Sequence, residues 1–284
     1  MNSNIQYIAR QIIAGNLILF VGSGVPASLD LPTWKGLIEK AAKDLGYDPE
    51  LFLMYGDYLP LAEYYRIKKG NIVELNKWMR ENWDVDENRI KESDIYRSIV
   101  NLNCPIIYTT NYDHTLETAF SASNTSYKKI VTVKDLVAIK EKTTQIIKFH
   151  GDMDKEYLDT MVFAESDYFK RLDFESPMDI KLRADMLGKS ILFIGYSLSD
   201  INIRLIIYKL DQLWKNTNSQ DNRPNSYIFL AKPNPIQESI FQERKLIPIV
   251  GAKPDPSESL KDFLQELVNE LNNQLQDDST VHTP

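Results

Sequence analysis

The segment Leu17-Ile18-Leu19-Phe20-Val21-Gly22-Ser23-Gly24 decides the fold class of this chain. Its first five residues form a continuous apolar run, which is typical of a strand buried on both faces of a parallel sheet. Gly22 ends the run, and Gly22-Ser23-Gly24-Val25-Pro26-Ala27 matches the glycine-rich turn that leads from a strand into a helix beside a pyrophosphate. A plain tight turn explains the same glycines. The segment therefore predicts a parallel strand, with a turn after it that either binds an anion or only reverses the chain.

Similar apolar runs recur along the chain, and helical patterns separate most of them. The further runs lie at 106–108, 146–149, 191–194, 227–230 and 246–250. The helical patterns lie at 3–14, 112–121, 176–188 and 201–215. Buried strands that alternate with helices predict an α/β fold, namely a Rossmann-like, mostly parallel sheet with helices on both faces.

Two regions interrupt this alternation. Residues 33 to about 100 hold only helix-like patterns, which predict a helical insertion lobe between the first two strands. Residues from about 257 to 275 predict a long amphipathic helix, followed by a polar tail from Gln276. That helix either packs on its own domain or contacts another copy of the chain. We expect residues 1–284 to form a single domain with these two additions.

The composition excludes several classes of function. The chain has 33 basic and 40 acidic residues and a net charge of -7, which opposes direct binding of nucleic acid or anionic lipid. Cys104 is the one cysteine, so a disulfide or a multi-thiolate zinc site within the chain is impossible. No apolar run approaches the roughly 20 residues that span a bilayer. The N-terminal residues lack the pattern of a secretory signal, and we expect a cytoplasmic protein.

A polar segment, Thr109-Thr110-Asn111-Tyr112-Asp113, follows the second strand. Thr110 or Asn111 is a suitable N-cap for the next helix, and Asp113 would favour the helix dipole. The amide of Asn111 both donates and accepts hydrogen bonds, so it could equally hold a sugar hydroxyl or a water. The segment predicts either a helix cap or a ligand contact.

Two further segments follow the third and fourth strands. His150-Gly151-Asp152 places a histidine at the mouth of the sheet, where it could be a general base or a structural hydrogen-bonding residue. Gly195-Tyr196-Ser197 could bind a ribose or phosphate, while Ser199 or Asp200 could cap the following helix. Ligands of parallel sheets bind beyond the carboxyl ends of the strands, so the four segments together predict a dinucleotide cleft.

In this order, the four segments resemble the signature segments of sirtuins. More closely, they resemble the divergent bacterial sirtuin-like domains that consume NAD in anti-phage defence, and Leu31-Pro32-Thr33-Trp34 looks like that branch too. The resemblance covers roughly residues 3–250. The chain departs from deacylating sirtuins because it lacks their Asp-Phe-Arg-type segment and the four zinc-binding cysteines after the His-Gly pair. A groove that clamps an acyl-lysine peptide is therefore not expected in that form.

The resemblance implies an NAD glycohydrolase that releases nicotinamide and ADP-ribose, with NAD as substrate and no metal. Asn111 would position the attacking water and the ribose hydroxyls, His150 would be the base, and Asp113 would orient the ribose or cap its helix. The residues expected to bind the rest of NAD are Gly22, Ser23, Gly24, Thr110, Gly195 and Ser197. Preference between NAD and NADP stays open.

Other functions of the same cleft are an NAD-dependent protein deacylase, an ADP-ribosyltransferase, or a sensor that binds NAD or ADP-ribose without turnover. Uncontrolled NAD hydrolysis would kill the host, so an effector of abortive infection must be regulated. The resemblance implies control by homo-oligomers and by a separate ATPase or sensor protein, for example a hexameric DNA-translocase-type ATPase. No direct contact with nucleic acid or membrane is expected.

Overall fold

A computed structural model describes residues 2–137, 139–140, 143–173, 175–196, 201–216 and 222–281. Its centre is a seven-stranded, all-parallel sheet with the strand order β3-β4-β2-β1-β5-β6-β7. The strands are β1 (Leu17–Val21), β2 (Ile106–Thr109), β3 (Tyr127–Ile130), β4 (Thr144–Lys148), β5 (Ser190–Ile194), β6 (Ser226–Leu230) and β7 (Leu246–Val250). The predicted Rossmann-like α/β class is confirmed.

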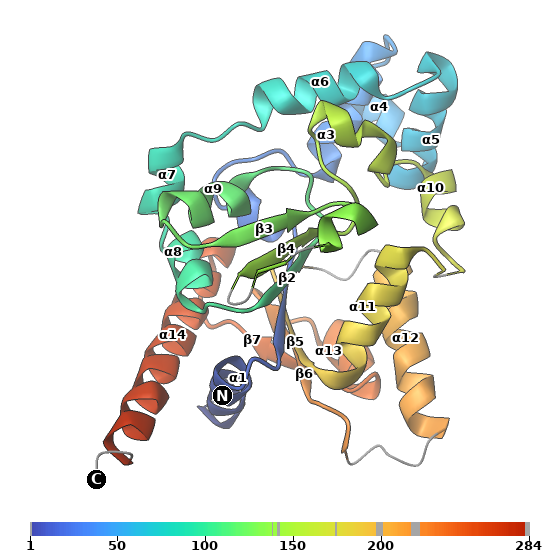
Figure 1. The fold of residues 1–284 in the computed structure, drawn as a ribbon. Helices are drawn as coiled ribbons and strands as arrows, with labels where there is room; N and C mark the ends of the chain where they lie inside the picture. The colour runs from blue at the N-terminus through green and yellow to red at the C-terminus, as the bar shows by residue number, and fades with distance from the viewer. Residues whose placement is uncertain are drawn as a thin grey trace.

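Alternate residues of the buried strands face two separate apolar cores. In β1, Leu17, Leu19 and Val21 point into one core, while Ile18 and Phe20 point into the other. Helices cover both faces (Figure 1). The first core is covered by α1 (Asn2–Ile13), α8 (Asp94–Asn101), α9 (Thr115–Ala122) and α14 (Pro256–Val281), and the second by α11 (Pro177–Gly188), α12 (Ile201–Asn216) and α13 (Pro235–Glu243).

The chain between β1 and β2 forms helices only, as expected for residues 33 to about 100. After the single turn α2 (Gly24–Ala27) come α3 (Trp34–Asp44), α4 (Pro49–Leu53), α5 (Tyr58–Lys69), α6 (Val73–Asn82) and α7 (Glu87–Glu92), ahead of α8. Figure 1 shows α3 to α6 gathered at one end of the molecule, with α10 (Glu165–Lys170) beside them. The 3-10 turns η1 (Val133–Leu136) and η2 (Lys155–Thr160) complete the elements.

The sequence analysis did not predict the strand β3. The edge strand β3 contains Lys128 and Lys129 between Tyr127 and Ile130, so it has no apolar run, and only Ile130 is fully buried. An edge strand pairs on one side only and tolerates charged side chains, which is why its pattern differs from that of the central strands.

Helix boundaries also differ at two places. The pattern at 112–121 predicted a helix that starts near Tyr112, but α9 begins at Thr115. The amphipathic helix predicted to end near residue 275 continues as α14 to Val281, because no glycine or proline stops it, so the described part of the polar tail from Gln276 is helical. The apolar face of α14 packs on the domain itself, against α1 and α8. Its buried residues are Leu260, Phe263, Leu264, Leu267 and Leu271.

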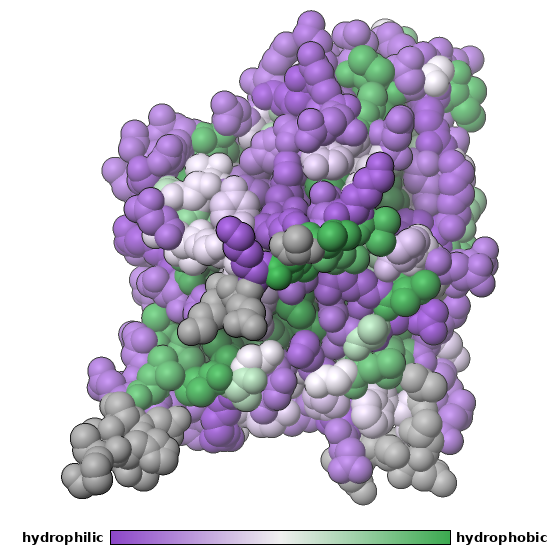
Figure 2. Space-filling model, viewed as in Figure 1, coloured by the Kyte–Doolittle hydropathy of each residue, from purple (hydrophilic) through white to green (hydrophobic). Residues whose placement is uncertain are grey.

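The face drawn in Figure 2 is mostly hydrophilic, and its hydrophobic residues form small groups. Among the described helices, none has both the length and the apolar character needed to traverse a lipid bilayer.

The turns after β1 and β5 touch backbone to backbone. The Gly22 N–H donates to the Ile194 carbonyl at 2.9 Å, and the Gly24 N–H donates to the Gly195 carbonyl at 2.8 Å. A Cβ on Gly22 would lie 2.3 Å from a ring carbon of Tyr196 and 2.4 Å from the Gly195 oxygen. Gly195 itself has a φ of +58°, in the left-handed region that favours glycine. The close contact explains Gly22 and Gly24, and the left-handed backbone adds a second reason for glycine at Gly195.

The substitution Gly22→Ala tests that contact. The added methyl group overlaps Tyr196 and the Gly195 carbonyl, so we expect a loss of about 1–3 kcal/mol in the free energy of unfolding, measured in urea. Gly188→Ala is the control, because a Cβ there meets no atom within 4 Å and the residue lies in α11. Equal stability of Gly22→Ala and wild type would show that the two turns do not need their close approach.

Candidate active site

A cavity of about 790 Å³ lies at the carboxyl ends of the central strands. Its wall includes Ser23 after β1, Thr110, Asn111 and Asp113 after β2, and His150 after β4. Three of the four predicted segments therefore place residues expected to act on the ligand in one cavity, which has a size typical of small-molecule sites. From the fourth segment Tyr196 lines the same cavity.

The opposite wall comes from the helical insertion lobe and is largely apolar and aromatic. It contributes Trp34, Leu37, Leu53, Tyr58 and Trp83, and α10 adds Tyr168. The sequence analysis placed the lobe between the strands but did not place it over the site. A polar floor under an apolar wall suits a ligand that has both sugar hydroxyls and an aromatic ring, and it limits the access of water.

Asn111 lies half-buried in the turn after β2. Its backbone N–H donates to the Thr109 hydroxyl at 3.0 Å, which fixes the turn. In the part of the chain that the structure describes, its side-chain amide forms no hydrogen bond, although the residue lines the cavity. The amide is therefore available to a ligand.

Asp113 supports the first turn of α9. Its buried carboxylate accepts hydrogen bonds from the Thr115 N–H at 3.0 Å and from the Thr115 hydroxyl. Thr110 and Asn111 do not cap the helix, because it begins later than predicted, with His114 at the N-cap position. Asp113 lies one residue before that position and accepts from the first helical N–H. Asp113 also borders the cavity, so its role towards a ribose stays a prediction.

His150 follows β4 and is 2% exposed. Its ring packs edge-on against Tyr168 of α10, with ring centroids 5.3 Å apart, and its carbonyl accepts from the Val162 N–H at 2.9 Å. These contacts hold the imidazole in one place at the cavity wall. Such a fixed, mostly desolvated imidazole is suited to general-base chemistry.

The predicted NAD-binding glycines lie behind the cavity. Gly22, Gly24 and Gly195 are not among its lining residues. The N–H groups of Gly22 and Gly24 donate to the carbonyls of Ile194 and Gly195. Ser23 is the residue of this glycine turn that reaches the cavity. Ser197 lies outside the described residues.

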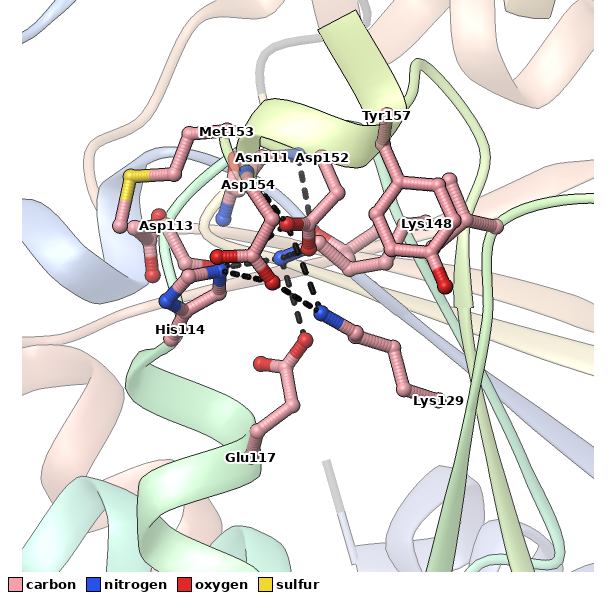
Figure 3. A network of polar contacts seen from close by, with 12 residues as sticks. Asn111, Asp113, His114, Glu117, Lys129, Lys148, Asp152, Met153, Asp154 and Tyr157 are labelled. Atoms are coloured by element: carbon pink, nitrogen blue, oxygen red, sulfur yellow. Dashed lines mark hydrogen bonds and ion pairs between the residues drawn. The ribbon is translucent and has the colours of Figure 1, made fainter. Parts of the chain in front are cut away.

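A cluster of charged side chains lies close to Asn111 (Figure 3). At its centre is Lys148, the last residue of β4, which is 1% exposed. The Lys148 ammonium donates to the Asp113 carbonyl, and it lies 3.3 Å from a Glu117 carboxylate oxygen and 3.5 Å from an Asp152 oxygen. The cluster thus joins the turn after β2 to the segment after β4.

The second half of the cluster surrounds Asp152. His114 Nε2 lies 2.9 Å from the Asp152 carboxylate, and Lys129 Nζ lies 2.7 Å from Asp154. His114, Asp152 and Asp154 could provide metal ligands within 4.8 Å of one another. The ammonium groups of Lys148 and Lys129 already balance these carboxylates at short range, which disfavours an additional cation at this point.

Charge pairing outweighs burial in the pKa values of this cluster. Burial lowers the pKa of His114, but the hydrogen bond and charge of Asp152 raise it further, and the net pKa lies above the usual value. Burial also lowers the pKa of Lys148, whereas Glu117 and Asp152 raise it to a higher net value. Burial raises the pKa of Asp152, but His114 and Lys148 hold it well below the usual range. Charge pairing therefore favours the ionised forms of His114, Lys148 and Asp152.

Comparisons with known proteins point to one family. The profile of the SIR2-like domain matches residues 105–249, about half of the chain. A protein named NAD(+) hydrolase ThsA from Enterococcus faecium is 30% identical over 250 residues, which are 84% of this chain and 49% of that protein. A protein of the same name from Cytobacillus dafuensis is 29% identical over 220 residues, 77% of this chain and 42% of that protein.

A third relative carries a different name. Defense-associated sirtuin 2 of Bacillus subtilis is 26% identical over 255 residues, which are 88% of this chain and 24% of that protein. The chain therefore spans less than half the length of each of these three relatives.

Replacing Lys148 tests the cluster as a structural support. Lys148→Met removes the buried cation beside Glu117 and one of the cations around Asp152, so we expect a loss of about 3–5 kcal/mol in the free energy of unfolding. The control Lys129→Met removes a more exposed ammonium and should cost clearly less. Equal losses for the two variants in urea unfolding would contradict the central position of Lys148.

The pair of His114 and Asp152 predicts a pH dependence. The pKa of His114 is raised on folding, so protonated His114 contributes stability that is complete below its ordinary pKa of 6.5 and is lost as the pH rises through the raised value. His114→Gln should therefore destabilise the protein most at acidic pH. Unfolding curves in urea between about pH 6 and 9 should show the two proteins converging. A difference that grows with pH would contradict the pairing.

Proposed function

Because this chain belongs to the SIR2-like domain family, we propose that it hydrolyses NAD to nicotinamide and ADP-ribose. One observation carries the proposal: the amide of Asn111, which has no hydrogen-bond partner among the described residues, and the imidazole of His150 line the same cavity just after the adjacent strands β2 and β4. The names of two relatives, NAD(+) hydrolase, support the reaction. The cavity also provides aromatic walls for the two rings of the substrate.

The reaction breaks the bond between C1′ of the ribose and the nicotinamide nitrogen. The leaving group takes the bonding electrons and departs as neutral nicotinamide, so no strong acid is needed. C1′ then resembles an oxocarbenium ion, as in other glycosyl transfers. One water adds to C1′, its proton passes to a base, and ADP-ribose is the second product.

In our proposal, each residue of the site has a separate role in this hydrolysis. Asn111 holds the water and a ribose hydroxyl through an amide that donates and accepts. His150 takes the proton from water or from the ribose hydroxyl. The wall formed by Trp34 and Trp83 limits the entry of other water molecules, which keeps the reaction to one nucleophile. Asp113 keeps the turn that carries Asn111 in place.

We also propose that this activity depletes NAD during anti-phage defence and is held inactive until it is triggered. The name of the Bacillus subtilis relative supports the defence role. Control by assembly with further copies of this chain, or with a separate ATPase or sensor protein, follows from the danger that free NAD hydrolysis poses to the host. Size-exclusion chromatography with light scattering, followed by the assay below on each species, tests the first route.

The assay follows nicotinamide and ADP-ribose by chromatography after incubation with NAD. Wild type should release both products, while Asn111→Ala and His150→Ala should lose at least about 100-fold in rate, because each removes a group that acts on the nucleophile. Asn88→Ala, on the exposed surface of α7, is the matched control and should retain full activity. Full activity of Asn111→Ala would contradict the assignment. Binding of NAD without any product from wild type, alone or with partners, would favour a sensor.

A further inference from the structure

The charge of the cavity wall is unbalanced for a dinucleotide. Its lining residues include the carboxylates of Asp57, Asp113 and Glu165. Among the described residues that line the cavity, Arg204 of α12 is the only basic residue of the lysine or arginine type. The diphosphate of NAD carries two negative charges, so binding it beside three carboxylates requires a cation or several free N–H donors.

The glycine turn after β1 does not provide enough free donors. The Gly22 and Gly24 N–H groups donate to the carbonyls at the end of β5 and in the turn after it, and the Val25 N–H donates back to the Gly22 carbonyl at 3.1 Å. Pro26 has no N–H. Ser23 therefore remains as the donor of this turn at the cavity, which is fewer donors than a glycine-rich phosphate loop normally offers.

Arg204 is placed to replace those donors. The neighbouring residues Ile203, Ile206 and Ile207 are buried in the second core, which fixes the first turns of α12, while Arg204 is exposed on the cavity side. Within the described chain its guanidinium forms no ion pair or hydrogen bond.

Two other arginines near the sheet already form ion pairs with carboxylates. Arg171 pairs with Asp179, and Arg223 pairs with Asp211 at 2.8 Å. Arg204 therefore differs from them in being available to a ligand. A guanidinium presents a planar fork that matches two oxygens of a phosphate, which a lysine cannot do.

We propose that Arg204 binds the diphosphate of the substrate, in a subsite that Ser23 completes from the opposite turn. This inference rests on the proposed function, because it assumes that the cavity holds NAD. It also defines the substrate class: ligands that contain a diphosphate are favoured over nucleosides with the same rings.

The test measures dissociation constants by calorimetry for ADP-ribose and for adenosine, which lacks phosphate. Arg204→Gln should weaken ADP-ribose binding by roughly tenfold or more, because a charge-assisted hydrogen bond contributes about 1.5–3 kcal/mol. Adenosine binding should be unchanged. Arg204→Lys keeps the charge without the fork and should lie between wild type and Arg204→Gln. Lys209→Gln, on the same helix but outside the cavity lining, is the control and should match wild type.

Each other outcome overturns the proposal. Unchanged ADP-ribose affinity in Arg204→Gln would remove Arg204 from the subsite and leave the proposed hydrolase intact. An equal loss for adenosine and ADP-ribose would show a general effect on the cavity. If wild type bound neither ADP-ribose nor NAD, the proposed function would fail together with the subsite.

Discussion

One buried ammonium group, that of Lys148, supports the site. It lies at the end of β4 and contacts the Asp113 carbonyl in the turn after β2, with Glu117 and Asp152 as its counter-ions. A buried charge is stable only when it is paired and hydrogen-bonded, so all of these groups must be in place together. Asn111 and His150 lie within two residues of members of this cluster, and their relative position depends on it.

The rest of the cavity follows from the topology. In the sheet, β1 lies between β2 on one side and β5 on the other. The turns after β1 and β5 meet at this position, and open parallel sheets bind ligands at such a switch in strand order. The glycines there allow the two turns to approach closely, and Ser23 remains at the cavity. The helical insertion lobe then closes the site with aromatic side chains.

The sequence predicted the central strands well because both of their faces are buried, and burial on both faces leaves an unmistakable apolar run such as Leu17–Val21. It predicted the convergence of Asn111 and His150 because parallel strands end at the same edge. It could not predict β3, where Lys128 and Lys129 replace the apolar residues. Lys148 lies within an otherwise apolar run, so its role was not predicted. The carboxylates around it become evident only from the fold.

The glycine turn illustrates a second limit of sequence patterns. Gly22 and Gly24 match a phosphate-binding pattern, yet their N–H groups are used within the protein, a fact that depends on the distance to Gly195 and not on the pattern. Arg204 lies far along the chain in a helix, and no local motif marks it as part of the cavity.

The most direct test of this account is a crystal structure of the His150→Ala variant with bound NAD, since that variant should bind the substrate without consuming it. We predict that the C1′ atom of the nicotinamide ribose lies beside the Asn111 amide, with the diphosphate between Ser23 and Arg204. A dinucleotide bound outside the cavity, or one with adenine in place of nicotinamide at Asn111, would contradict the account.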